Sequence, residues 1–114
     1  MVLLPEYKAA YIALEKEDLE KFQLKTGDTE GIVNYPLGIN GIEIAAMITD
    51  RTQNKSSENE IRLSLRSIGE FPVNELSRRY FNGGGHKNAA GGQINTSIKD
   101  AVERFKTALK AFQQ

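Results

Sequence analysis

Hydrophobic residues recur at every second position in one stretch near the middle of the chain. They are Ile42, Ile44, Ala46 and Ile48, and the opposite positions carry Glu43, Ala45, Met47 and Thr49. A period of two is that of a β-strand, because successive side chains point to opposite faces of a sheet. The pattern therefore predicts a strand here, and the polar run at residues 50–58 predicts a loop after it.

A second alternating stretch covers residues 60–67. Its hydrophobic positions are Ile61, Leu63 and Leu65, and the positions between them are Arg62, Ser64 and Arg66. The stretch predicts a strand with one face in the core and one face carrying two cations with a hydroxyl between them. Such a face would suit the wall of an anion site, but a solvated sheet face has the same pattern. The periodicity leaves both interpretations open.

Other stretches predict a strand at residues 7–14 and helices at 17–22, 73–80 and from Ser97 onward. Acidic residues in the first turn favour the first of these helices, and Thr26-Gly27 favours its end. Asp28 or Thr29 would cap another short helix, which Pro36 would stop after Tyr35. The last helix has an apolar stripe of Ile98, Ala101, Val102, Phe105, Leu109 and Phe112. Residues 92–95 predict an edge strand.

These elements predict an α+β fold, in which a mixed sheet of about four to five strands is flanked by helices. With 114 residues, of which 39% are hydrophobic, the chain suits a single small domain. We place the domain at residues 6–112 and interpret residues 1–5 as a linker remnant.

The charges balance, with 15 basic and 15 acidic residues. A net charge of zero argues against a general nucleic-acid coat, so any anionic ligand would have to meet a local patch. The chain has no cysteine, which excludes disulfides and thiolate chemistry and weakly favours a cytoplasmic location. No apolar run approaches the length of a membrane span, and we expect no membrane partner.

The segment at residues 83–92 reads Gly-Gly-Gly-His-Lys-Asn-Ala-Ala-Gly-Gly and contains the only histidine, His86. It predicts a loop entering a short helix near His86, with the amides of Gly83, Gly84 and Gly85 turned toward one point. Such a device would bind a phosphate. A plain glycine turn is the alternative. The flanks favour a compact binding device, because Asn82 suits a left-handed helix exit and Ala89 to Gly92 allow close backbone packing.

Catalytic constellations are missing from the sequence. Two-metal phosphoester hydrolysis needs several aspartates and histidines gathered together. The candidates are Asp18, Asp28, Asp50, Asp100 and His86, and they are scattered over separate predicted elements. We therefore expect no catalytic residue and no metal ligand in this chain, and we interpret it as a binding domain.

Residues 81–91 resemble the glycine-histidine signature of the DHH-associated C-terminal domain, the substrate-binding half of many DHH-family phosphoesterases. The segments at residues 29–34 and 63–67 are similar to two weaker motifs of that family, in the same order. The resemblance extends over residues 11–109.

The resemblance implies that Gly83, Gly84, Gly85 and His86 hold phosphate, and that Arg66 and Ser67 contact substrate. It implies that Asn88, Ala89 and Ala90 shape the adjoining backbone. It also implies an N-terminal DHH catalytic domain in the same polypeptide, containing the metal centre with Mn²⁺. The chain would then be a fragment that binds no cofactor itself and is not active alone.

The function implied is that of the substrate-binding domain of a phosphoesterase that hydrolyses short oligoribonucleotides, 3′-phosphoadenosine 5′-phosphate or a related phosphate chain. An alternative is a free-standing RNA-binding or tRNA-binding module of the type associated with alanyl-tRNA synthetase. A structural dimerisation domain is a third interpretation. The sequence leaves open the choice of substrate, the oligomeric state, and whether Arg62 or Lys87 contacts ligand.

Overall fold

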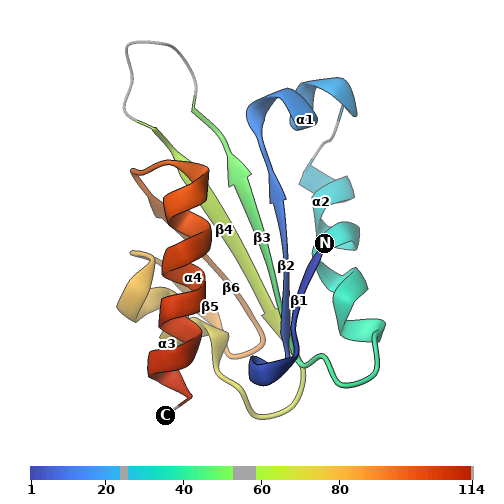
Figure 1. Cartoon of the computed structure of the whole chain (residues 1–114), viewed down its shortest axis with the longest axis vertical. Coiled ribbons are helices and arrows are strands. Elements are labelled where there is room, and N and C mark those ends of the chain that lie inside the picture. Colours follow the sequence, from blue (N-terminus) through green and yellow to red (C-terminus); the bar gives the residue numbers. More distant parts are fainter. Residues whose placement is uncertain (24–25, 53–58, 114) are drawn as a thin grey trace.

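A six-stranded mixed sheet forms the centre of the described structure (Figure 1). The computed structural model describes residues 1–23, 26–52 and 59–113, and of residues 26–29 only the backbone. The strands are β1 (Val2–Leu4), β2 (Ala9–Leu14), β3 (Ile44–Asp50), β4 (Ile61–Ser67), β5 (Gly84–His86) and β6 (Ala89–Ile94). Their spatial order is β1-β2-β3-β4-β6-β5, and only the β2–β3 pair is parallel. The α+β prediction is confirmed, with slightly more strands than expected.

Helices cover the two faces of the sheet unequally. The helices are α1 (Lys16–Lys21), α2 (Thr26–Asn34), α3 (Val73–Tyr80) and α4 (Ile98–Phe112), and the 3₁₀ turns are Pro5–Tyr7 and Tyr35–Gly38. On one face, α3 packs against β4, β5 and β6, and α4 packs against α3 and β3. On the other face, α2 packs against β3 and β4 (Figure 1). The sheet is thus wrapped on one face and only partly covered on the other.

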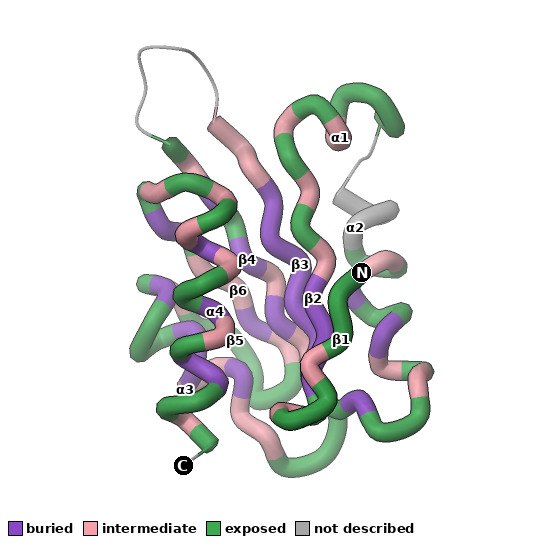
Figure 2. The backbone as a smooth tube through the Cα atoms, viewed as in Figure 1, coloured by how far each residue is buried: buried purple, intermediate pink, exposed green. Residues whose placement is uncertain are grey.

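The main hydrophobic core lies between the sheet and the α3–α4 pair. Its largest fully buried side chains from this layer include Ile48, Ile61, Leu63, Leu65, Leu76, Phe81, Phe105 and Leu109. The alternation of β4 is confirmed, because Ile61, Leu63 and Leu65 are buried and Arg62 is exposed. Strand β3 is buried on both faces, since α2 covers the face that carries Met47 (Figure 2).

Several predicted helices and turns are confirmed with shifted ends. The Ser97 hydroxyl caps α4 by accepting a hydrogen bond from the Asp100 N–H at 3.1 Å. Helix α2 begins at Thr26, so the prediction that Thr26-Gly27 ends a helix and that Asp28 or Thr29 starts the next is wrong. Packing against β3 stabilises α2 and offsets the low helix propensity of Gly27. The first predicted strand begins at Ala9, after a 3₁₀ turn. Most of the predicted loop, residues 53–58, lies outside the described residues.

The glycine segment is a β-hairpin, so the predicted helix near His86 is wrong. β5 and β6 are antiparallel, with His86 opposite Ala89, and Lys87 and Asn88 form the turn. The predicted edge strand at residues 92–95 overlaps the end of β6. Residues 92–94 pair with β4, and β5 pairs with residues 89–91 on the other side of β6. Pairing on both sides supplies partners for the β6 backbone, and this tertiary gain outweighs the helix propensity of Ala89 and Ala90.

Two glycines of the hairpin let it approach the end of α3. A Cβ on Gly83 would overlap the carbonyl oxygen of Gly91, and a Cβ on Gly92 would overlap the carbonyl oxygen of Phe81. The Ser77 hydroxyl on α3 donates a hydrogen bond to the same Gly91 oxygen. Asn82 makes the left-handed exit from α3, with φ of 53°, as predicted. The close backbone packing expected of residues 83–92 is therefore packing of the hairpin against the end of α3.

A pair of glycine substitutions tests this packing. We expect Gly83→Ala to lower the free energy of unfolding by at least about 2 kcal/mol, because its methyl group collides with backbone. A methyl group on Gly84 would meet open space, with nothing beyond its chain neighbours within 4 Å. Gly84→Ala should therefore change stability by less than about 0.5 kcal/mol. Urea denaturation of both variants measures the difference. Equal stability of the two variants would contradict the packing argument.

Candidate functional site

Arg66 and His86, two of the predicted site residues, project from the same face of the sheet. In the β4–β6 pair Arg66 lies opposite Ala89, and in the β6–β5 pair Ala89 lies opposite His86. Residues directly opposite each other in adjacent strands point to the same face. Two strand spacings of about 4.8 Å separate the Arg66 and His86 backbones. The residue between them in this row is Ala89, whose side chain is a single methyl group.

This face is open to solvent over β6 and β5. Helix α2 packs against β3 and β4, and the residues beyond it are exposed or half-buried. His86 and Gly84 are exposed, and Ala89 and Gly91 are half-buried. The opposite face carries the buried Ala90 on β6 and the buried Leu65 on β4. We call the open area around the Arg66–Ala89–His86 row the open face.

Arg66 is already held by groups of the protein. Its Nε donates to Glu30 Oε1 at 3.1 Å and its Nη2 donates to Glu30 Oε2 at 2.6 Å, which makes a bidentate ion pair. Its Nη1 donates to the carbonyl oxygens of Leu65 at 2.9 Å and Ala90 at 3.3 Å. A guanidinium has five N–H donors, so these contacts leave one on Nη2. An incoming anion could form a two-pronged contact with Arg66 only by displacing Glu30.

The ion pair with Arg66 changes the pKa of the Glu30 carboxylate. The hydrogen bond from Arg66 is the main cause that lowers the pKa of Glu30 below its usual value of 4.5, with the charge of Arg66 acting in the same direction. The Glu30 side chain is 57% exposed, whereas that of Arg66 is 16% exposed. Glu30 can therefore leave toward solvent, but the guanidinium stays packed against the sheet.

Ser67 and Asn88 hold the hairpin turn. The Ser67 hydroxyl donates to the carbonyl of Phe71 at 2.7 Å and accepts from the Asn88 side-chain amide at 2.9 Å. The same amide donates to the carbonyl of Gly69 at 3.2 Å. Ser67 is buried. These contacts tie the turn between β5 and β6 to the end of β4, which is a positioning role.

The predicted convergence of glycine amides does not occur. The Gly83 N–H donates to the Ser77 carbonyl at 3.2 Å. The Gln93 N–H donates to the Phe81 carbonyl, so the odd-numbered residues of β6 turn their backbone toward β5. Antiparallel pairing then directs the backbones of Gly84 and His86 into the β5–β6 ladder and that of Gly85 away from it. The prediction treated the glycines as a helix N-terminus, and the strand pairing removes that geometry.

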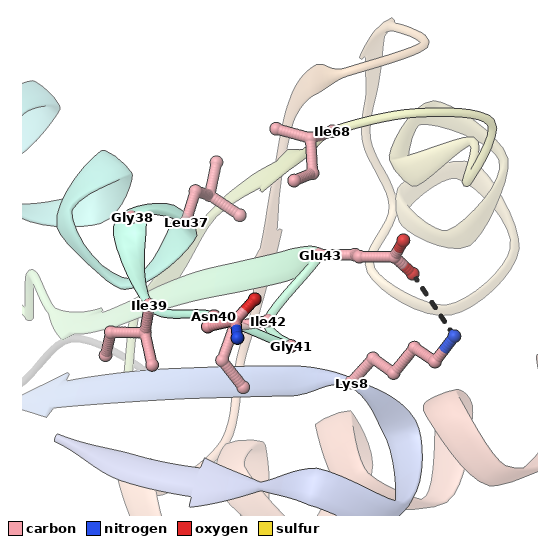
Figure 3. Close-up of a pocket in the computed structure, with 9 residues that line it drawn as sticks. All are labelled: Lys8, Leu37, Gly38, Ile39, Asn40, Gly41, Ile42, Glu43 and Ile68. Atoms are coloured by element: carbon pink, nitrogen blue, oxygen red, sulfur yellow. Dashed lines mark ion pairs between the residues drawn. The ribbon is translucent and has the colours of Figure 1, made fainter.

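Lys87 and a cavity lie at the end of the sheet where β4 stops. Lys87 Nζ pairs with Glu70 Oε2 at 2.6 Å. The cavity, of about 510 Å³, is bounded by the turn after α2 and by Lys8, Glu43 and Ile68 (Figure 3). Its cation, Lys8, pairs with Glu43 at 3.9 Å. Lys8 and Lys87 each have a carboxylate partner, as Arg66 does.

Two further side chains belong to the open face, and the sequence pattern did not single out either one. In the sequence Glu30 is one of several acidic residues without an evident partner, because its contact with Arg66 spans 36 positions. Gln93 lies opposite Arg62. The period-two pattern from Ala89 onward would place Gln93 there, once the segment is taken as a strand.

Neither a metal cluster nor a membrane span is evident in the part of the chain that the structure describes. Its histidine, aspartate and glutamate side chains form no group of three or more that could hold a metal ion. Among the same residues, none of the helices has the length and hydrophobicity that crossing a bilayer requires.

The sequence profile of the DHHA1 domain matches residues 6–114. The chain belongs to the DHHA1 domain family. The predicted relationship to the DHH-associated C-terminal domain is thereby confirmed.

Two curated relatives are phosphoesterases by name. A 3′,5′-cyclic-nucleotide phosphodiesterase of Helicobacter pylori is 36% identical over 108 residues, which cover 82% of this chain and 29% of the relative. The bifunctional oligoribonuclease and PAP phosphatase NrnA of Bacillus subtilis is 33% identical over 93 residues, which cover 82% of this chain and 27% of the relative. This DHHA1 domain thus spans less than a third of either protein.

Solved structures agree with the fold. An exopolyphosphatase-related protein from Bacteroides fragilis matches with a TM-score of 0.84 and 38% identity, over 96% of this chain and 31% of that one. The C-Ala domain of alanyl-tRNA synthetase from Aquifex aeolicus matches with a TM-score of 0.59 and 14% identity, over 89% of both chains. The second likeness shows a shared fold only.

The ion pair at the centre of this DHHA1 site predicts a pH dependence of stability. A carboxylate with a lowered pKa stabilises the folded state above its unfolded pKa and loses that contribution as the pH falls through the folded pKa. We expect the free energy of unfolding of wild type to exceed that of Glu30→Gln by about 0.2–1 kcal/mol at pH 7. The difference is small because solvent screens the exposed Glu30. The difference should disappear as the pH is lowered below 4.5, the usual carboxyl pKa. Thermal unfolding of both proteins between pH 7 and pH values below 4.5 measures the difference in stability. A difference that stays constant with pH would contradict the prediction.

Proposed function

We propose that the open face of this DHHA1 domain binds the phosphate of a nucleotide or short oligonucleotide, as the substrate-binding part of a DHH-family phosphoesterase. One observation carries the proposal. Arg66 on β4 and His86 on β5 project from the same exposed sheet face on either side of β6, where Ala89 is the residue between them. A guanidinium and an imidazole at that spacing suit the oxygens of one phosphate group.

His86 and Arg66 have different roles in this proposal. His86 is exposed on the edge strand, where a ligand reaches its ring without moving any element. Arg66 is preorganised by two carbonyl oxygens, and a phosphate would replace Glu30 on its remaining edge. Exchange of one anion for another keeps the guanidinium paired throughout, which avoids leaving a half-buried charge without a partner.

Gly84 differs from the glycines that pack against α3. Gly84 is exposed, has ordinary backbone angles, and has open space where a side chain would be. The fold itself does not require glycine at this position. Its lack of a side chain leaves a flat area beside His86 where a ligand can approach the backbone closely.

Catalysis would require a second domain. In the proposed enzyme an N-terminal DHH domain of the same polypeptide supplies the metal centre, with Mn²⁺ as the implied ion. The described residues of this chain lack a suitable group of ligands, so they do not fit a metal site. This chain's contribution is to hold and orient the phosphate, and closure of the two domains would exclude water.

The candidate substrates are short oligoribonucleotides, 3′-phosphoadenosine 5′-phosphate and related phosphate chains. Support comes from the relative whose name is oligoribonuclease and PAP phosphatase. The alternative of an RNA-binding or tRNA-binding module has support only from a fold likeness at 14% identity, and fold alone does not determine function.

Binding of adenosine 5′-monophosphate by the isolated chain tests the site. We expect His86→Ala and Arg66→Ala each to weaken binding by about tenfold, the loss of one charge-assisted hydrogen bond. Arg104→Ala is the matched control, because Arg104 is an exposed, ion-paired arginine on α4 beyond the other face. Calorimetric titration gives the affinities. Since His86 is the only histidine, its ring proton signals also report directly whether ligand reaches it. Equal binding by all variants would remove the assignment, and binding of long RNA alone would support the module instead.

The same titration with Glu30→Gln tests the exchange at Arg66. A neutral amide competes less well than a carboxylate for the guanidinium, so the variant should bind adenosine 5′-monophosphate about two- to fivefold more tightly than wild type. Glu103→Gln on α4 is the control for removing one negative charge. Equal gains in both variants would show a general charge effect and contradict the exchange.

A further inference from the structure

The open face continues past the Arg66–His86 row toward the start of β4. The next row consists of Ser64 and the opposed Gly91, followed by Gly84 on β5. The row after that pairs Arg62 with Gln93. All these residues share one face, because they stand an even number of positions from Arg66 or directly across from such residues.

A cleft of about 320 Å³ lies over these rows. Its lining includes Arg62, Ser64, Asn82, Gly91 and Gln93. Gly91 forms part of its floor without a side chain. The polar groups around the floor are a guanidinium, a hydroxyl and two amides, and no carboxylate of the described residues lines the cleft. This chemistry suits an anionic ligand that lies flat on the sheet.

Arg62 is the cation of this face that the contacts above do not use. Its side chain is exposed, and no ion pair joins it to another described residue. Arg66 differs, because most of its donors are already committed. Arg62 can therefore meet an anion without displacing a carboxylate of the described part of the chain.

The spacing of the two arginines selects the kind of ligand. Arg62 and Arg66 are four residues apart on one strand, which corresponds to about 13 Å at roughly 3.3 Å per residue. Side chains of a strand stand roughly perpendicular to the sheet, so a phosphate at the Arg66–His86 row leaves Arg62 for a second phosphate. A chain with several linked phosphates can lie along β4 and reach both positions.

We propose that the Arg62–Gln93 cleft is a second phosphate subsite, which holds the backbone of an oligonucleotide whose first phosphate lies at the Arg66–His86 row. Among the described residues no aromatic ring lines the cleft, so it offers no stacking platform for a base. The subsite contacts the backbone and adds affinity without sequence preference. It rests on the proposed function and extends it, because it distinguishes oligonucleotides from mononucleotides.

The test compares adenosine 5′-monophosphate with 5′-phosphorylated triadenylate, using wild type, Arg62→Gln and the control Arg104→Gln. We expect Arg62→Gln to weaken triadenylate binding by about three- to tenfold and to leave mononucleotide binding unchanged. The dependence of triadenylate affinity on salt should also fall by about 0.7 in the log–log slope, the value for one phosphate contact on a single strand. Arg104→Gln should match wild type with both ligands.

Each failure has a separate signature. If wild type binds the mononucleotide through His86, but Arg62→Gln binds triadenylate as wild type does, the second subsite is wrong and the proposed function stands. An equal loss for both ligands in Arg62→Gln would also overturn the subsite, because it would place Arg62 at the first phosphate. If wild type binds neither ligand, the proposed function itself fails.

Discussion

The close approach of the glycine hairpin to the end of α3 is the constraint on which the site depends. Gly83 and Gly92 let the β5 and β6 backbones pass where a side chain would collide with carbonyl oxygens. The Ser77 hydroxyl and the Phe81 carbonyl then fasten β6 to α3. This contact helps hold β6 beside β4 in one register. A shift of that register by one residue would turn His86 to the opposite face from Arg66.

The electrostatics of the open face are local and do not follow from the net charge. The whole chain carries equal numbers of acidic and basic residues. On this face, however, Arg62, Arg66 and His86 stand together, and Glu30 is the described carboxylate that contacts them. The carboxylate of Glu30 pairs with Arg66, whose side chain is only 16% exposed. Arg62 and His86 are exposed, and no ion pair joins Arg62 to another described residue.

The site residues divide into those that contact ligand in our proposal and those that position them. Ser67 and Asn88 were both predicted to lie at the site, and the structure shows them bonded to each other and to the turns around them. Their contacts hold the hairpin turn against the end of β4. A motif residue can thus be essential to a site through the geometry it maintains.

The sequence alone determined the elements whose periodicity is strong and the residues that carry unusual chemistry. The alternation in β3 and β4, the capped helix at Ser97, and the sole histidine among glycines were all visible in it. Local patterns suffice there, because each depends on neighbours a few positions away. It also placed Arg62, Ser64 and Arg66 on one face.

Only the tertiary structure decided what the glycine segment is and which groups meet. Residues 83–92 have the local features of a loop and helix, but strand pairing with β4 makes them a hairpin. Arg66 pairs with Glu30 across 36 positions of sequence, and it lies in one row with His86 because β6 pairs with both β4 and β5. Such contacts depend on the register of distant segments, and pairing with a neighbouring strand can outweigh local propensity because it satisfies backbone groups that a lone segment leaves to water.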